Sequence, residues 1–498
     1  MPQTIPHYIN GNSVKNTGEK QYSVYNPATG DVTAKVACAT LVEINNAISA
    51  AKKAFISWSQ VTPLKRARVL FNFKNLLDKN IDKIATLLTS EHGKTLDDAK
   101  GEVLRAIELV EFSCGIPTLL QGNYSENVGT GVDTYTIKQP LGICVGISPF
   151  NFPVMISTWL MIPAIACGNT FILKPSEKDP SVTLLLAELL QESGLPAGVF
   201  NILQGDKETV DALITHPDIA AVSAVGSTPV AESIYKTAIS HGKRAHTFGG
   251  AKNHCVVMPD ADMDDAADAL LGAAFGAAGE RCMAISVAVA VTDAVADALI
   301  ERLKIKIPQL KIASGMNANV DMGPLITKEH AAHVKNCVNT GIKEGAELVV
   351  DGRDIKNADF KNGFFMGGCL FDKVTKDMRI YQDEIFGPVL CIMRVENFIE
   401  AIALINSNHY GNGVAIFTRD GGLARTFASQ VTVGMVGINV PIPVPVAYHT
   451  FGGWKRSVFG DIHMHGPDNV QFYTRSKTVT LRWPESKKEK SAYHMISH

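Results

Sequence analysis

Four short runs of apolar residues restrict most strongly what this chain can fold into. They cover residues 142–147, 170–173, 199–203 and 219–225. Continuous apolar runs of this length are typical of strands that are buried on both faces of a sheet. The stretches between them have helical spacing and cover residues 154–166, 182–193 and 208–215. This alternation predicts a doubly wound, parallel α/β sheet with helices on its faces.

The rest of the chain is arranged around this region. Short strands are predicted within residues 8–36, and amphipathic helices within 41–58, 63–92 and 96–114. A second α/β region follows, with helices predicted at 263–275, 293–303 and 330–345 and strands at 347–351 and 389–395. The polar interval 121–139 is predicted to form a projecting hairpin, and residues 473–483 alternate as one more strand would.

Composition indicates an ordinary soluble enzyme rather than a protein that binds a macromolecule. A chain of 498 residues is too long for one hydrophobic core, so two or three domains are expected. The formal net charge of -2 gives no reason to expect a nucleic acid or a membrane surface as partner. The most apolar stretch, 153–166, is too short to span a bilayer, and residues 1–10 have no leader pattern. Nine scattered cysteines without a Cys-x-x-Cys pair favour a reducing compartment, taken as the cytoplasm, and no metal site.

Polar side chains stand where several of the predicted strands end. The first strand runs into Ser148-Pro-Phe-Asn151, at the sheet edge where such folds bind ligands. Asn151 is either a donor to a developing oxyanion or a turn residue between prolines. The next strand ends in Lys174-Pro-Ser-Glu177, which could hold the hydroxyls of a ribose or form a surface ion pair. The fourth strand leads into Ser227-Thr-Pro, a helix start that can accept a pyrophosphate.

A thiol and a cation are neighbours in the stretch 275–284, which reads Phe-Gly-Ala-Ala-Gly-Glu-Arg-Cys-Met-Ala. Arg281 directly precedes Cys282, and a nearby positive charge favours the thiolate, which is the nucleophilic form of cysteine. Gly276 and Gly279 allow other backbone to come close to this loop. The alternative is a buried structural cysteine beside a solvated arginine.

Taken in order, these motifs resemble the aldehyde dehydrogenase superfamily. The resemblance covers nearly the whole chain and rests on Pro149-Phe-Asn-Phe-Pro153, Lys174-Pro-Ser-Glu177, Val225-Gly-Ser-Thr228, Cys282 and Glu384-Ile-Phe-Gly-Pro388. It implies that Cys282 is the nucleophile and that Asn151 stabilises the oxyanion. It also implies that NAD is the cofactor and is held by Ser148, Phe150, Lys174, Glu177, Lys178, Ser227 and Glu384.

The resemblance further implies how the chain is divided. An aldehyde dehydrogenase-like fold would place a Rossmann-like NAD-binding domain at 1–121 and 141–249 and an α/β catalytic domain at 250–465. A β hairpin at 122–140 and the tail at 466–498 would then serve oligomerisation, and a homotetramer is expected.

One departure from the superfamily bears on the reaction. Hydrolytic members carry a glutamate just before Gly-Gly-Lys, and here Thr247 falls at or next to that position. Threonine is no base near neutral pH, and water, with a pKa of about 15.7, needs one. A thiol with a pKa of roughly 8.5 is partly ionised without help. A thioester on Cys282 is therefore expected to react with a thiol more readily than with water.

Three further stretches resemble the methylmalonate-semialdehyde dehydrogenase branch, which acylates coenzyme A. They are Gly249-Gly-Ala-Lys-Asn-His254, Gly279-Glu-Arg-Cys-Met-Ala284 and Asn439-Val-Pro-Ile-Pro-Val-Pro445. This branch implies coenzyme A as co-substrate and a decarboxylating oxidation of methylmalonate or malonate semialdehyde, in valine or inositol breakdown. The products would be propionyl-CoA or acetyl-CoA. A hydrolytic enzyme that releases a free acid is the alternative, and a non-catalytic relative would have lost the thiol or the cofactor contacts.

In this branch a pair of arginines grips the substrate carboxylate, and Arg105 and Arg281 stand at the matching positions. A guanidinium suits this role because its fork can pair bidentately with a carboxylate. Arg105 could instead be a surface residue of a helix, paired with Glu102 or Glu108. Smaller departures from the family are Glu280 for glutamine, Ala224 for an aromatic residue and Lys178 for arginine. Glu280 is expected to compete with the substrate for the charge of Arg281.

Overall fold

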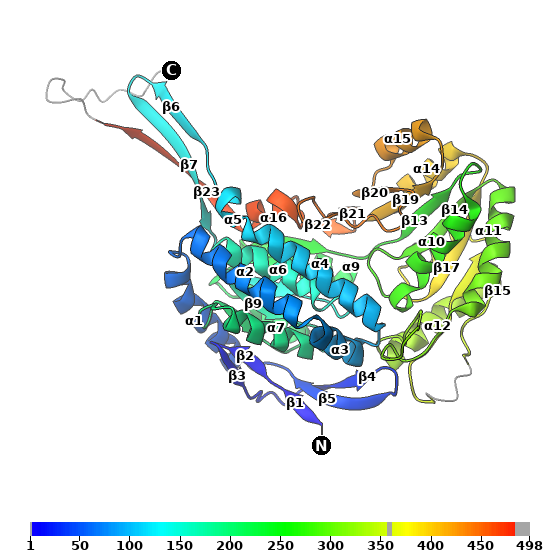
Figure 1. Cartoon of the computed structure of the whole chain (residues 1–498), viewed down its shortest axis with the longest axis horizontal. Coiled ribbons are helices and arrows are strands. Elements are labelled where there is room, and N and C mark those ends of the chain that lie inside the picture. Colours follow the sequence, from blue (N-terminus) through cyan, green and yellow to red (C-terminus); the bar gives the residue numbers. More distant parts are fainter. Residues whose placement is uncertain (1, 356–360, 484–498) are drawn as a thin grey trace.

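Two large sheets, each covered by helices, form the body of the protein, and a narrow β arm projects from one end (Figure 1). The structure is a computed structural model that describes residues 2–355 and 361–483. The last part of the predicted oligomerisation tail, 484–498, lies outside the described residues. Within the described part of the chain, no helix combines the length and the apolar composition that crossing a bilayer requires.

The first sheet contains the four predicted strands in parallel, as expected. They are β8 (Ile143–Ile147), β9 (Thr170–Lys174), β10 (Phe200–Ile202) and β11 (Ile219–Val225), and β12 (Arg244–Phe248) extends the sheet. The helices between these strands are α6 (Met155–Ala166), α7 (Ser181–Glu192), α8 (Lys207–Thr215) and α9 (Thr228–Ser240). Helix α6 is buried along its whole length, which explains why its sequence has no polar face. The doubly wound prediction is confirmed.

The preceding residues complete this half of the molecule. Helix α1 (Leu41–Trp58) packs with α8 and α9 on one face of the sheet, while the other helices lie over α6 and α7. Those helices are α2 (Pro63–Lys79), α3 (Ile81–His92), α4 (Leu96–Cys114) and the short α5 (Ile116–Leu119). Strands β2 (His7–Ile9) and β3 (Asn12–Val14) add to the sheet edge, and β1 (Gln3–Ile5), β4 (Gln21–Asn26) and β5 (Asp31–Ala37) form a small sheet of their own.

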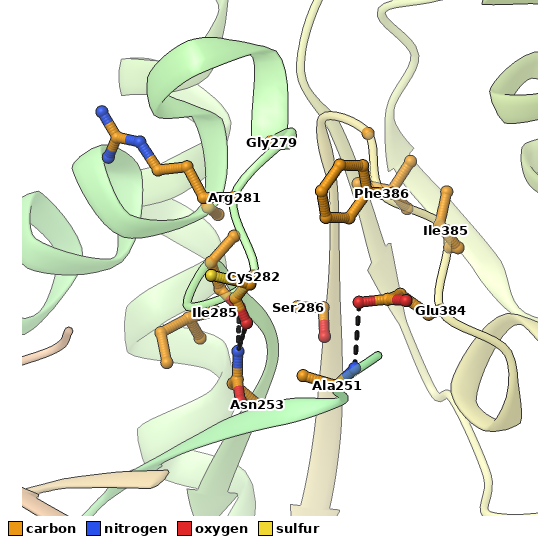
Figure 2. A pocket seen from close by; sticks show the side chains of 14 residues that line it. Ala251, Asn253, Gly279, Arg281, Cys282, Ile285, Ser286, Glu384, Ile385 and Phe386 are labelled. Carbon is orange, nitrogen blue, oxygen red and sulfur yellow. Dashed lines mark hydrogen bonds between the residues drawn. The ribbon is translucent and has the colours of Figure 1, made fainter. Parts of the chain in front are cut away.

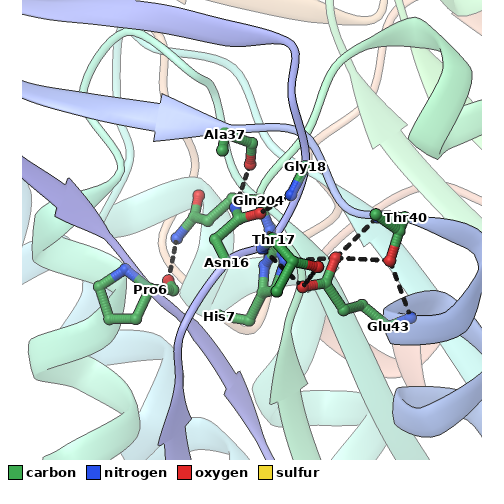
Figure 3. Close-up of polar contacts among 9 residues, drawn as sticks. All are labelled: Pro6, His7, Asn16, Thr17, Gly18, Ala37, Thr40, Glu43 and Gln204. Atoms are coloured by element: carbon green, nitrogen blue, oxygen red, sulfur yellow. Dashed lines mark hydrogen bonds and ion pairs between the residues drawn. The ribbon is translucent and has the colours of Figure 1, made fainter.

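A buried carboxylate, Glu43, ties the N-terminal strands to α1 (Figure 3). Glu43 accepts hydrogen bonds from both the backbone and the hydroxyl of Thr17, at 2.9 Å each, and of Thr40, at 2.7 and 2.8 Å. His7 lies 3.4 Å from the same carboxylate and accepts a bond from the Gln204 backbone N–H. Although burial opposes the shift, these hydrogen bonds lower the pKa of Glu43 to about 2. Through His7, strand β2 is thereby anchored to Glu43 of α1 and to the Gln204 backbone.

The second sheet supports the other half. Its parallel strands are β16 (Cys369–Asp372), β17 (Val389–Val395), β14 (Ile285–Val291), β13 (Asn253–Val257), β19 (Gly413–Phe417) and β20 (Met435–Ile438), and β15 (Glu347–Val350) pairs antiparallel at one edge. The larger helices around it are α10 (Met263–Phe275), α11 (Asp293–Lys306), α12 (Lys328–Lys343), α14 (Phe398–Ser407) and α15 (Gly421–Gln430). The chain passes from the first sheet to the second between residues 248 and 253.

The predicted hairpin and tail strand meet in the arm. Strands β6 (Tyr124–Gly129) and β7 (Val132–Pro140) form the hairpin, and β23 (Thr474–Arg482) pairs antiparallel along the whole of β7 (Figure 1). Before it reaches the arm, the chain returns to the first half. Strand β22 (Val458–Phe459) pairs with β12 of the first sheet, and α16 (Gly466–Phe472) packs against α6.

Candidate active site

The backbone before Cys282 adopts a conformation that L-residues rarely take. Helix α10 ends at Phe275, and in the short turn that follows Ala277, Ala278 and Gly279 have φ values of 50°, 53° and 74°. Left-handed backbone costs an alanine roughly 1–2 kcal/mol, and such strain is concentrated at functional sites. The two glycines singled out in the sequence allow close approach, because a Cβ at Gly279 would overlap the Gly387 carbonyl and one at Gly276 the Arg281 guanidinium.

Two amide side chains fix the peptide group of Cys282. The Cys282 carbonyl accepts hydrogen bonds from Asn253 Nδ2 at 2.9 Å and from Asn412 Nδ2 at 3.1 Å. Asn253 also donates to the Ala284 carbonyl at 2.9 Å and accepts from the Gly413 backbone N–H at 3.0 Å. These bonds lock the nucleophile loop to strands β13 and β19. Neither asparagine was predicted from the sequence to have a role in the site.

Cys282 shares a pocket with Glu384 (Figure 2). Glu384 Oε1 accepts a hydrogen bond from the Ala251 backbone N–H at 2.9 Å, and its other oxygen leaves no room for a Cβ at Gly250. Lys252 holds the turn before Glu384 by donating at 2.8 Å to the carbonyls of Ile380 and Asp383. Burial raises the pKa of Glu384 to about 7. The predicted nucleophile and one predicted cofactor residue therefore lie in the same pocket.

Burial also has the largest effect on the pKa of the Cys282 thiol. It raises the pKa of Cys282 to about 12, with a smaller contribution from the negative charge of Glu384. The backbone N–H groups of Cys282 and Met283 and the charge of Arg281 act in the opposite direction. The charge of Arg281 therefore favours the thiolate, as expected from the sequence, but burial outweighs it. The Arg281 guanidinium extends away from Glu384 (Figure 2).

Asn151 is buried at the end of β8 and held through its backbone. Its carbonyl accepts a hydrogen bond from Lys94 Nζ at 2.5 Å, and Lys94 pairs with Glu102 at 2.7 Å, both side chains being inaccessible to solvent. Glu102 in turn accepts from the backbone N–H groups of Val154 and Met155, at 2.8 and 3.0 Å. The Asn151 side chain makes no hydrogen bond to another described residue. Its amide is therefore available to a ligand, while its backbone is fixed.

Most of the predicted cofactor residues gather at the carboxyl ends of β8 and β9. The Ser148 N–H donates to the Lys174 carbonyl at 3.1 Å, and Lys174 Nζ lies 3.3 Å from Glu177. The Lys174 side chain is only 7% exposed, so this is not the simple surface pair considered above. Ser227 is exposed at the N-terminus of α9, and its side chain makes no capping bond.

Phe150 connects this group to the Cys282 pocket. Lys178 Nζ lies 4.3 Å above the ring of Phe150, and the ring of Phe386 packs edge-on at 5.8 Å. Phe386 lines the pocket that contains Cys282 and Glu384. Phe150 and Phe386 therefore link Lys178, after the end of β9, to the pocket of the thiol.

The two predicted carboxylate-binding arginines both have acidic partners. Arg105 Nη1 lies 2.9 Å from Glu108, on the same exposed face of α4. Arg281 Nη2 pairs with Asp98 of α4. The pairing of Arg105 with Glu102, considered as an alternative above, is wrong, because Glu102 is turned inward toward Lys94.

Glu280 faces away from Arg281. Its side chain is fully buried, and Oε1 accepts a hydrogen bond from the Ile326 backbone N–H at 3.1 Å. His330 Nε2 lies 3.6 Å from the carboxylate and His92 Nε2 lies 4.0 Å from it. Burial raises the pKa of Glu280 to about 8. The expected competition between Glu280 and the substrate for Arg281 is therefore wrong, since adjacent side chains of this segment point to opposite sides.

No carboxylate stands at the position where hydrolytic relatives have their glutamate. Thr247 lies in β12 beside Ala224 of β11, and its hydroxyl donates at 2.8 Å to the Ala231 carbonyl of α9. The next residue, Phe248, is buried in the hydrophobic core. Neither side chain can deprotonate a water molecule.

Comparisons with known proteins identify a family and several similar relatives. The sequence model described as the aldehyde dehydrogenase family matches residues 14–479. Malonate-semialdehyde dehydrogenase from Pseudomonas aeruginosa is 55% identical over 482 residues, which are 97% of this chain and 97% of that protein. The acylating, mitochondrial methylmalonate-semialdehyde dehydrogenase from Arabidopsis thaliana is 47% identical, over 97% of this chain and 80% of that one.

Among solved structures, a chain from Sinorhizobium meliloti 1021 complexed with NAD superposes with a TM-score of 0.97. It is 54% identical, and the alignment covers 98% of this chain and 100% of that one. The aldehyde dehydrogenase-like fold expected from the motifs is confirmed by this agreement.

Proposed function

Because this chain belongs to the aldehyde dehydrogenase family, we propose that it oxidises malonate semialdehyde or methylmalonate semialdehyde with NAD and passes the acyl group to coenzyme A. The names of the full-length relatives support this substrate class. The substrate carboxyl group leaves as CO₂, and the products are acetyl-CoA or propionyl-CoA.

The residues at the ends of the strands fit NAD. Lys174 and Glu177 offer an ammonium and a carboxylate side by side, which suits the hydroxyls of a ribose, and Glu177 disfavours a 2′-phosphate. The exposed N-terminus of α9 suits a pyrophosphate. Glu384, in the pocket of the thiol, would hold the second ribose. When bound, NAD supplies the hydride acceptor for the oxidation.

The side chains around Cys282 divide the chemistry among them. The Cys282 sulfur attacks the aldehyde carbon, and the Asn151 amide and the Cys282 N–H donate to the oxygen as it becomes negative. Lys94 and Glu102 keep Asn151 in place, and Asn253 and Asn412 keep the Cys282 peptide in place. Such preorganisation supplies donors that need not move during the reaction.

The coenzyme A step is supported by one observation: Thr247, at or next to the position expected for the hydrolytic glutamate, and its neighbour Phe248 carry no base. We expect steady NADH formation from malonate semialdehyde to require coenzyme A, with acetyl-CoA as the product. Without coenzyme A, roughly one NADH per active site should form before the reaction stalls at the thioester. Desulfo-coenzyme A, which has no thiol, serves as the control. An equal steady rate without coenzyme A, with a free acid as product, would favour the hydrolytic alternative.

Replacing Arg105 by leucine tests the carboxylate assignment. We expect kcat/KM for malonate semialdehyde to fall about ten- to a hundredfold relative to that for propanal, which has no carboxylate. Each charge-assisted hydrogen bond contributes roughly 1.5–3 kcal/mol. The matched control is Lys100→Leu, on the same helix, where the lysine pairs with Asp82. If the ratio of kcat/KM for the two aldehydes is unchanged in Arg105→Leu, Arg105 is a surface residue of the helix and does not bind the substrate carboxylate.

We also propose a cytoplasmic homotetramer. All nine cysteines are free, as suits a reducing compartment. The arm exposes apolar side chains at Tyr124, Val128 and Ile137, which a partner subunit would cover. The mass in solution, from sedimentation or light scattering, tests the stoichiometry, and a monomer would contradict it.

A further inference from the structure

The two arginines proposed to bind the substrate carboxylate are already neutralised by carboxylates of the chain itself. Arg105 pairs with Glu108, and Arg281 pairs with Asp98. The four charges cancel, so the arginines present no net positive charge to an anionic substrate. A carboxylate that binds here has to share a guanidinium or replace the side chain that holds it.

The two ion pairs differ in their exposure to solvent and in the elements that they connect. Arg105 and Glu108 lie three residues apart on one helix with side chains 37% and 43% exposed, and such surface pairs contribute little. Arg281 and Asp98 come from the nucleophile loop and from α4, and their side chains are 21% and 23% exposed. Of the two, the Arg281–Asp98 pair is the one that joins distant parts of the chain.

Asp98 and Arg281 are both held in place. The Asp98 backbone N–H donates at 3.1 Å to the hydroxyl of Thr95, which caps α4. Arg281 lies against Gly276, where a Cβ would collide with its guanidinium, and Nη1 lies 3.5 Å from the Gly272 carbonyl. The missing side chain at Gly276 provides the space in which the guanidinium reaches Asp98.

Arg281 stands between the thiol and a surface groove. It lines the pocket of Cys282, and it also lines a groove together with Asp98, Asp268 and Ile442. Asp98 lies on the groove side, and Cys282 directly follows Arg281 in the chain. A change in the ion-pair partner of Arg281 therefore alters the charge both in the Cys282 pocket and in the groove.

We propose that Asp98 determines specificity by holding Arg281 until a substrate carboxylate takes its place. This rests on the proposed function. A guanidinium has five N–H donors and binds a well-placed carboxylate bidentately, whereas Asp98 uses Nη2 alone. A semialdehyde carboxylate can therefore exchange with Asp98, while an aldehyde that lacks a carboxylate leaves the Asp98–Arg281 pair intact.

Malonate, an inert dicarboxylate, is the probe for this exchange. Its inhibition constant is measured against propanal oxidation in the wild type and in Asp98→Asn, and divided by KM for propanal. We expect this ratio to fall about three- to tenfold in Asp98→Asn, because the internal competitor is removed. Asp268→Asn is the matched control, since Asp268 lines the same groove but pairs with Lys306. It should leave the ratio unchanged.

A second measurement separates competition from simple support of the fold. With Asp98 neutral, the charge of Arg281 is no longer balanced beside Cys282, so alkylation by iodoacetamide should reach its half-maximal rate at lower pH. A purely structural role of Asp98 would not move this midpoint downward.

The outcomes are distinct. A ratio that stays constant or rises in Asp98→Asn, with the wild type inhibited by malonate, would overturn the role of Asp98 and leave the proposed function standing. A wild type that oxidises propanal without inhibition by malonate would overturn the carboxylate site, and both proposals with it.

Discussion

Replacing Cys282 by alanine is expected to abolish NADH formation from every aldehyde while NAD binding stays within about twofold of the wild type. The thiol forms the covalent bond to the substrate, and none of the contacts proposed for the cofactor uses it. Loss of a nucleophile commonly costs a factor of about 10⁴ or more in kcat. Stopped-flow NADH formation measures the first effect, and calorimetric titration with NAD measures the second.

Cys337→Ala is the matched control for this experiment. Cys337 is the other cysteine with partial exposure, and it lies on α12 outside the Cys282 pocket. Its replacement should leave NADH formation intact. If Cys282→Ala retained a tenth of the wild-type rate, Cys282 would not be the nucleophile.

The second large effect is expected from Lys94→Met. It leaves the Glu102 carboxylate buried without its cation, and breaking a buried ion pair from one side costs about 3–5 kcal/mol. Denaturant unfolding measures this loss. The folded fraction should also turn over more slowly, because the Asn151 carbonyl loses the bond that holds it at the end of β8. Lower kcat with little change in KM for NAD is the pattern expected.

Two comparisons make the Lys94 experiment decisive. Lys100→Met removes an exposed lysine from α4 and should cost less than about 1 kcal/mol. The double variant Lys94→Met/Glu102→Gln removes both charges and should be more stable than Lys94→Met alone, because no unpaired charge remains buried. A Lys94→Met protein as stable as Lys100→Met would show that the pair does not support the site.

The fold was largely predictable because burial on both faces leaves a local signature. The runs that became β8, β9 and β11 are short and mostly apolar, as is typical of strands covered on both faces. The pattern within 63–92 continues across a break, so only the structure shows that α2 and α3 are separate, with Asn80 between them.

The site was predictable where function lies at strand ends, and not where it depends on partners distant in sequence. Lys94 and Glu102 have no sequence feature that separates them from a solvated pair on a helix. Asn253 and Asn412 both donate to the Cys282 carbonyl, although all three residues are far apart in the chain. No sequence spacing indicates such a contact. Alanine gives no sign of a positive φ, so the turn before Cys282 was invisible. Glu280 and Arg281 are adjacent in sequence, but Glu280 bonds to the Ile326 backbone and Arg281 pairs with Asp98, a divergence that adjacency in sequence does not reveal.

The arm sets an order of events during synthesis. The hydroxyls of Thr134 in β7 and Thr480 in β23 lie 3.3 Å apart, although 346 residues separate them in the chain. A ribosome therefore releases the β6–β7 hairpin long before the strand that covers its outer edge exists. Until translation ends, that edge offers free N–H and C=O groups to any strand nearby, including β23 of a finished copy. Completion within one chain and exchange between two chains thus compete for the same edge, and the outcome depends on how many chains are being made side by side.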